Sequence, residues 1–205
     1  MLILVRHGQS EMNAAGVLVG RSDPALTERG VRQAEATGRH LARVRNSRGA
    51  GDLPLVVVTS PLRRARRTAA VLLGAAGYAA EVGVDERLAE IDYGELEGVD
   101  PGEVGEARWE AWRRDPSWRP PGGETLSEVH ARVASWCEEV AAAAATGDVL
   151  AVSHVSPIKA AAAWAIGAGP ELAWRTTLAV AAITCISTAP RALHSFGEGG
   201  HLLGL

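Results

Sequence analysis

Short runs of aliphatic and β-branched residues alternate along this chain with longer segments of helical periodicity, and this alternation constrains the possible folds most strongly. The clearest runs, at residues 2–5, 55–58 and 149–152, have the length of buried strands. Between them, apolar residues recur three or four positions apart, as in the helix expected after Thr27. Alternating strands and helices favour a mostly parallel central sheet with helices on both faces. We therefore predict an α/β fold, a three-layer sandwich, in one domain over residues 1–205.

Weaker patterns place the remaining elements. We expect one helix over about 62–73, a second that begins at a capping box of Thr125 and Glu128, and a third that follows the strand at 149–152 and ends at about Trp164. Further strands are expected near 82–84, 180–187 and 191–196. Residues 92–123 lack periodicity and are rich in Gly, Pro, Arg and Trp, so we predict an inserted, lid-like excursion there. Residues 197–205 are predicted to form a tail.

Charge and hydropathy argue against several classes of function. A net charge of -3 and a pI of about 6.1 argue against a nucleic-acid partner, because such domains are usually basic. No apolar run reaches the roughly 18 residues of a membrane helix, and the opening MLILVRHGQS lacks the basic region of a signal peptide. We therefore expect a cytoplasmic protein without a membrane partner. Cys137 and Cys185 are expected to be buried free thiols.

Four polar clusters lie just past predicted strands. They are residues 6–8, residues 60–64, Glu90 and His154. In open α/β sheets, ligands bind in the crevice outside the carboxyl ends of the strands. We therefore expect these clusters to meet at one rim of the sheet, where they bring together two histidines, at least two arginines and a glutamate.

This set of side chains suits phosphoryl transfer through a covalent intermediate. An imidazole is a competent nucleophile near neutral pH, since its reference pKa is about 6.5. Guanidinium groups match the oxygens of a phosphoryl group, and a carboxyl group can protonate the leaving alkoxide. Gly8 lets the backbone approach a phosphate closely. No cluster of Asp, Glu or His has metal-site spacing, so we predict a reaction that uses neither a metal nor a cofactor.

Six sequence blocks also resemble one family, in its order and over almost the whole chain. They are LVRHGQSEMN (4–13), GRSDPALTERGVRQA (20–34), TSPLRRARRTA (59–69), LAEIDYGELEG (88–98), PGGET (121–125) and AVSHVSPIK (151–159). Together they resemble the histidine phosphatase superfamily, which includes the cofactor-dependent phosphoglycerate mutases. The form of the fourth block is more similar to the phosphatase branch, with its α-ribazole phosphatase-like enzymes. The resemblance implies a hydrolase that acts on a small phosphorylated metabolite.

The resemblance also implies a role for each matched residue. His7 corresponds to the phosphorylated nucleophile, and Glu90 to the general acid and base. Arg6, Arg64 and His154 correspond to the residues that hold the transferring phosphoryl group.

Further phosphate contacts and two departures from the family pattern follow from the same blocks. Asn13 is expected to orient the phosphate, with support from Ser10. Val155 replaces the usual Gly after the second histidine, and its backbone N–H is expected to remain available to a phosphate. Leu96 replaces a frequent Trp. Neither substitution removes a catalytic group, but both obscure which substrate fits.

Several alternatives stay open at this point. Arg63, Arg66 and Arg67 are expected on a solvated face. The tryptophans of the excursion either pack internally or line a substrate entrance that favours an apolar leaving group.

Three functions are candidates. The first function is a phosphomonoesterase acting through phosphohistidine. The second is a phosphoglycerate mutase, because basic residues also occur in the excursion, and the third is an inactive module that binds phosphate-bearing ligands. A homodimer is a candidate assembly.

Overall fold

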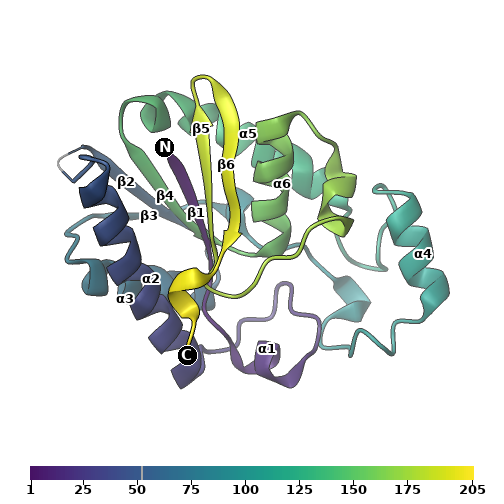
Figure 1. The fold of residues 1–205 in the computed structure, drawn as a ribbon. Helices are drawn as coiled ribbons and strands as arrows, with labels where there is room; N and C mark the ends of the chain where they lie inside the picture. The colour runs from purple at the N-terminus through teal and green to yellow at the C-terminus, as the bar shows by residue number, and fades with distance from the viewer. Residues whose placement is uncertain (52) are drawn as a thin grey trace.

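The computed structural model describes residues 1–51 and 53–205, through which a six-stranded sheet runs (Figure 1). Its strands are β1 (Leu2–Arg6), β2 (Leu55–Thr59), β3 (Val82–Val84), β4 (Asp148–Ser153), β5 (Ile183–Thr188) and β6 (Arg191–Glu198). Their order across the sheet is β3-β2-β4-β1-β5-β6. The pairs β1–β4, β2–β4 and β2–β3 are parallel, whereas β5 is antiparallel to both of its neighbours. The predicted mostly parallel sheet is therefore confirmed.

Helices cover both faces of this sheet, which confirms the three-layer arrangement (Figure 1). The α-helices are α1 (Glu11–Ala15), α2 (Glu28–Ser47), α3 (Arg63–Ala76), α4 (Glu106–Arg114), α5 (Leu126–Thr146) and α6 (Val155–Ile166). Short 3₁₀ helices are η1 (Glu86–Leu88), η2 (Gly94–Leu96), η3 (Pro170–Trp174) and η4 (Gly200–Leu202). Helices α2 and α3 pack together on one face, and α5 and α6 pack together on the other.

Side-chain alternation along the strands divides the core into two clusters, one on each face of the sheet. Ile3 and Val5 of β1 belong to a cluster with Leu72 of α3. Leu2 and Leu4 point to the opposite face and belong to the cluster that contains α5 and α6. Successive strand residues face opposite sides, so β1 is apolar on both and is buried in the centre of the molecule.

Side-chain caps explain where the two longest helices begin. The Thr27 hydroxyl accepts a hydrogen bond from the Gly30 N–H at 3.0 Å and caps α2. Thr125 and Glu128 form the predicted capping box, in which the Glu128 side chain accepts the Thr125 N–H at 2.9 Å and the Thr125 hydroxyl accepts the Glu128 N–H at 3.0 Å. These bonds satisfy N–H groups that a helix N-terminus leaves unpaired.

Some elements differ from the sequence-based expectation. The prediction of a tail over 197–205 is wrong: β6 continues to Glu198, η4 follows, and the ring of His201 stacks on His40 of α2 at 4.9 Å. The excursion over 92–123 contains η2 and α4. Cys137 and Cys185 are both free, and Cys185 is only partly buried. Within residues 1–51 and 53–205, no helix has the length and apolar character needed to cross a bilayer.

Strand register brings the ends of three strands to one edge of the sheet. Arg6 at the end of β1 is level with Ser153 of β4, and Thr59 of β2 is level with Val152. The next residue of each strand therefore lies at the same edge, and the backbone N–H of His7 donates to the Ser153 carbonyl at 3.0 Å. The candidate site is built at this edge.

Candidate active site

His7 follows β1 directly, and its ring is held in one tautomer. Its Nδ1 lies 2.7 Å from the Gly8 carbonyl oxygen, which can only accept a hydrogen bond, so Nδ1 carries the proton. Its Nε2 then presents a lone pair and accepts the Nε–H of Arg64 at 3.3 Å. The side chain is 3% exposed, and burial, followed by the positive charge of Arg6 and Arg64, holds the pKa of His7 well below its usual value. His7 is therefore neutral and can act as a nucleophile through Nε2.

Arg64, in the first turn of α3, is fixed by backbone carbonyls. Its Nη1 donates to the Ser22 oxygen at 2.5 Å and its Nη2 to the Gly20 oxygen at 2.8 Å. The side chain is fully buried, and burial lowers its pKa from the ordinary arginine value. Each terminal nitrogen keeps a second N–H, because guanidinium carries five donors in a fixed plane. Arg64 is thus oriented against His7 with donors left for an anion.

Arg6 and His154 also face this site with unused buried nitrogen atoms. Arg6 Nη1 donates to the Leu178 oxygen at 2.6 Å, but its buried Nε has no partner among the residues that the structure describes. The ring of His154 lies 4.9 Å from that of His7, and its Nε2 is 2.7 Å from the Ser60 hydroxyl, whereas its buried Nδ1 has no partner within that same set. Buried polar atoms without partners are rare, so these two nitrogens are available to contact a ligand.

Glu90 is held by three backbone N–H groups. Its Oε1 accepts from Ile91 at 2.9 Å and from Ser156 at 3.1 Å, and its Oε2 accepts from Val155 at 3.1 Å. Two of these donors belong to the first turn of α6, directly after His154. The carboxyl group is 4% exposed, and these three bonds fix its orientation at the start of α6.

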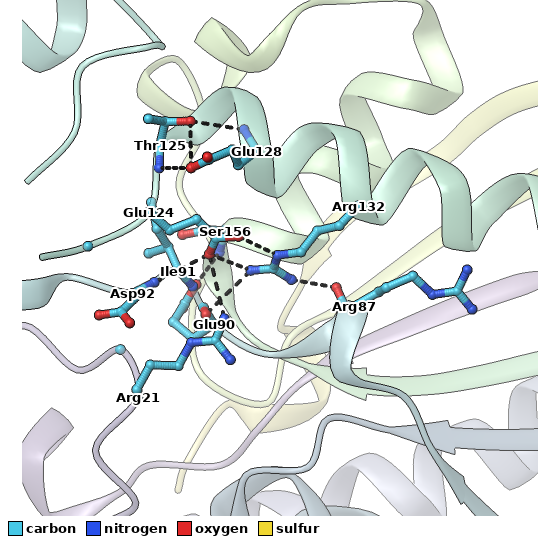
Figure 2. A network of polar contacts seen from close by, with 12 residues as sticks. Arg21, Arg87, Glu90, Ile91, Asp92, Glu124, Thr125, Glu128, Arg132 and Ser156 are labelled. Atoms are coloured by element: carbon cyan, nitrogen blue, oxygen red, sulfur yellow. Dashed lines mark hydrogen bonds and ion pairs between the residues drawn. The ribbon is translucent and has the colours of Figure 1, made fainter.

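A polar network behind Glu90 fixes the loop that carries it (Figure 2). Arg132 of α5 donates to both carboxylate oxygens of Glu124, at 2.7 and 3.0 Å, and to the carbonyl oxygens of Arg87 and Glu90. Arg21 completes the network at 3.7 Å from Glu124. Bidentate arginine–carboxylate pairs are geometrically specific, so this network positions the Glu90 backbone relative to α5.

The other predicted phosphate contacts are arranged differently. Ser10 and Asn13 form the capping box of α1: the Asn13 Oδ1 accepts the Ser10 N–H at 3.1 Å and the Ser10 hydroxyl at 2.9 Å. Ser10 therefore fixes the orientation of the Asn13 side chain, and the Asn13 amide N–H donors remain for a ligand. The expectation for the Val155 N–H is corrected, because this group donates to Glu90 and is not free for a phosphate.

Three further residues, to which no catalytic or phosphate-binding role was assigned from sequence, also support the site. Ser60 contacts His154, and Thr68 of α3 accepts the Gly8 N–H at 3.1 Å. Glu97 accepts the N–H groups of Gly20, Arg21 and Ser22, which fixes the loop whose carbonyls hold Arg64. All three lie in or beside the matched blocks, and that was the available signal. Among residues 1–51 and 53–205, no group of three His, Cys, Asp or Glu side chains is arranged to hold a metal ion.

Comparisons with known proteins agree with this geometry. A family model described as the histidine phosphatase superfamily (branch 1) matches residues 2–195. A 2,3-bisphosphoglycerate-dependent phosphoglycerate mutase from Methylobacterium radiotolerans is 46% identical over 138 residues, which cover 65% of this chain and 62% of that protein. A bifunctional protein from Mycobacterium tuberculosis is 38% identical over 186 residues, which cover 89% of this chain and 49% of that protein. The chain thus spans less than two thirds of the length of the first relative and about half of the length of the second.

A solved structure covers the chain more completely. The mycobacterial glucosyl-3-phosphoglycerate phosphatase in complex with VO3 is 29% identical, with a TM-score of 0.80, and the match covers 97% of this chain and 98% of that one. The whole arrangement of sheet and helices is therefore shared with that phosphatase.

Proposed function

Because this chain belongs to the histidine phosphatase superfamily, branch 1, we propose that it hydrolyses small phosphomonoesters through a phosphohistidine formed at His7. The observation that carries the proposal is the state of His7: a neutral ring, a proton on Nδ1 bonded to the Gly8 carbonyl, and an unprotonated Nε2 whose lone pair accepts the Nε–H of Arg64 at 3.3 Å. The mycobacterial phosphatase with the same fold supports a hydrolase rather than a binding module.

In the first step, His7 Nε2 attacks phosphorus in line with the leaving oxygen. The N–P bond forms, the P–O bond breaks, and the leaving oxygen takes a proton from the Glu90 carboxyl group. Arg6, Arg64 and His154 stabilise the charge on the three equatorial oxygens. As the ring becomes cationic, its Nδ1–H bond to Gly8 becomes charge-assisted and strengthens.

In the second step, water attacks the phosphohistidine. The Glu90 carboxylate accepts the water proton, the N–P bond breaks, and orthophosphate leaves with His7 neutral again. The scheme uses no metal and no cofactor, because the guanidinium groups of Arg6 and Arg64 supply the positive charge. Its partner is a small phosphorylated substrate.

Replacing His7 by alanine tests this function. We expect His7→Ala to lower p-nitrophenyl phosphate hydrolysis, measured in excess EDTA, by at least about 10³-fold, because it removes the nucleophile. The control variant, His194→Ala, removes an exposed histidine of β6 and should keep the rate. Brief incubation with a ³²P-labelled ester should label wild type and not His7→Ala, and vanadate should inhibit wild type competitively. Full activity of His7→Ala, or a requirement for added Mg²⁺ or Zn²⁺, would contradict the proposal.

The second candidate function is phosphoglycerate mutase activity, which the Methylobacterium relative favours by its name. A mutase returns the phosphoryl group to a second hydroxyl and keeps the phosphoenzyme from water. Conversion of 3-phosphoglycerate to 2-phosphoglycerate that depends on 2,3-bisphosphoglycerate, with little release of orthophosphate, would select this function. Release of orthophosphate as the main product would select the phosphatase.

A further inference from the structure

A small cavity of about 100 Å³ lies beside the residues that hold the Glu90 carboxyl group. Its walls include Ile91, Val155 and Ser156, the three residues whose backbone N–H groups hold Glu90. In the proposed reaction the leaving oxygen must lie within hydrogen-bond reach of Glu90. The organic part of the substrate therefore extends toward this cavity.

Aromatic rings form most of the remaining wall. Trp109 and Trp112 of α4 stack with ring centroids 5.8 Å apart, and Trp174 of η3 meets Trp112 edge-on at 5.6 Å. Tyr93 meets the edge of Trp112 at 5.9 Å from another direction. Pockets for drug-sized ligands usually measure about 300–1,000 Å³, so this cavity accommodates one ring or a few carbon atoms.

One charged side chain lines the cavity. Lys159 is the only lysine among the 21 Lys and Arg residues of the sequence. Its ammonium group is partly buried and donates one hydrogen bond to the Ala173 oxygen at 2.6 Å. No carboxylate of the described part of the chain lies within 4 Å of it, and burial lowers its pKa from the ordinary lysine value. A partly buried ammonium without a paired anion is costly, so a ligand that supplies an anion gains affinity there.

The neutral polar atoms of the cavity point to the same chemistry. The indole N–H groups of Trp112 and Trp174 are buried and have no acceptor within residues 1–51 and 53–205. An indole nitrogen can only donate. No aspartate or glutamate side chain lines the cavity. The lining residues therefore include one positive charge and two donors without acceptors, which suits a group that is flat or apolar and carries acceptor oxygens.

We propose that this cavity binds the leaving group and that Lys159 selects a carboxylate on it, so that the substrates are phosphate esters of small carboxylate-bearing alcohols or phenols. This inference rests on the function proposed above. A neutral leaving group leaves the ammonium unpaired, and a cationic one is repelled by it. A nucleoside exceeds the size of the cavity. Lys159 acts on specificity and takes no part in bond breaking.

Two matched pairs of substrates test the proposal. The 3- and 4-carboxyphenyl phosphates differ from the corresponding carbamoylphenyl phosphates by one negative charge at nearly constant shape. For each pair, the measured quantity is the ratio of kcat/KM for the carboxylate to kcat/KM for its carbamoyl analogue. We expect this ratio to be at least about 10 for wild type. Lys159→Gln, which keeps a hydrogen-bond donor, should bring the ratio to within about twofold of one. Lys159→Arg should retain most of the preference, because the charge stays.

A charge control separates local from general electrostatics. Arg175→Gln removes an exposed cation just after η3, outside the cavity wall, and should leave the ratio unchanged. A wild-type ratio near one, or an equal ratio in wild type and Lys159→Gln, would overturn the proposal.

Binding without turnover keeps this inference distinct from the phosphatase function. Because the chain has a single lysine, reductive ¹³C-methylation gives one side-chain signal beside that of the terminal amine. Non-hydrolysable (4-carboxybenzyl)phosphonate should shift the Lys159 signal, and its carbamoyl analogue should do so much less. Loss of hydrolysis with this difference intact would reject the phosphatase and keep the carboxylate subsite. Hydrolysis together with equal shifts for the two phosphonates would keep the phosphatase function and reject the carboxylate subsite.

Discussion

At the residue scale, the site depends on two buried imidazoles that stay uncharged. His7 and His154 lie 4.9 Å apart beside the guanidinium groups of Arg6 and Arg64. Burial, aided by nearby positive charge, holds the pKa of both rings well below the usual histidine value. In the unfolded chain each ring binds a proton near pH 6.5. The arrangement that keeps both rings neutral therefore makes the folded protein sensitive to acid.

We predict that the free energy of unfolding falls as the pH drops below about 6.5. There the unfolded chain binds protons that the two folded rings do not, so stability rises with pH at up to about 1.4 kcal/mol per pH unit for each ring. This contribution is fully present above pH 6.5 and declines until the lowered pKa of the folded state is reached. Urea denaturation of wild type, His7→Gln and His154→Gln between pH 5 and 7 measures it.

Each of the two variants should have a smaller slope than wild type, by about one proton. The matched control is His194→Gln, at an exposed position of β6, which should keep the wild-type slope. Equal slopes in wild type and both buried-histidine variants would contradict the prediction.

Residue types at the site could be predicted from sequence, but their hydrogen-bond partners could not. His7, Arg64 and Glu90 were identified from strand ends and matched blocks. The use of the Val155 N–H by Glu90 depends on where α6 begins relative to a loop 65 residues away. Such a pairing has no local sequence pattern.

At the scale of elements, two glycines let α2 approach the loop after β1. A Cβ on Gly30 would lie 2.1 Å from the Gln9 carbonyl oxygen, and a Cβ on Gly8 would lie 2.3 Å from the Gly30 oxygen. No side chain tolerates such contacts with backbone. The first turn of α2 therefore sets the path of the segment that carries His7.

Gly30→Ala should be destabilising by about 1–3 kcal/mol, because backbone must move to admit the methyl group. The matched control is Gly74→Ala, on the exposed side of α3, where an added Cβ meets nothing within 4 Å. That change should be neutral or stabilising by up to about 1 kcal/mol, since alanine favours a helix interior. Urea denaturation measures both effects, and effects of the same sign and size would contradict this account of the α2 contact.

Long elements were predictable and short ones were not. Helix α5 was located by its capping box and apolar stripe, which arise within one segment. Helix α1 has five residues, too few for a periodic signal. Helix η4 lies in a Gly-rich segment that was predicted to be a tail, and it is ordered through contacts of His201 with Thr37 and His40 of α2. Those contacts are tertiary, so local patterns do not report them.

At the scale of the whole molecule, an aromatic cluster joins the excursion to the α/β body. Trp112 of α4 is 2% exposed and contacts the rings of Tyr93, Trp118 and Trp174, the last of which belongs to the body. Helix α4 is only nine residues long, and isolated helices of that length are marginal in water. Its position therefore depends on this ring cluster.

Trp112→Ala should lower the free energy of unfolding by about 3–5 kcal/mol and open the excursion locally. The matched control is Trp136→Ala in α5, equally buried in the same core cluster but absent from the ring contacts of α4. Limited proteolysis followed by mass spectrometry should show early cleavage within about residues 100–118 for Trp112→Ala. The Trp136→Ala variant should show no such selective cleavage, and identical cleavage patterns would contradict this role of Trp112.

The central place of β1 also bears on how the protein is made. This strand pairs with β4 and β5, whose residues follow it by more than 140 positions. On a ribosome, β1 therefore emerges well before β4 and β5, the two strands with which it pairs. Contacts that are so distant in sequence form slowly, and an unpaired apolar strand is prone to aggregate meanwhile. The nascent chain thus has to keep Leu2 to Val5 protected until β4 and β5 have been synthesised and the edge that carries His7 can form.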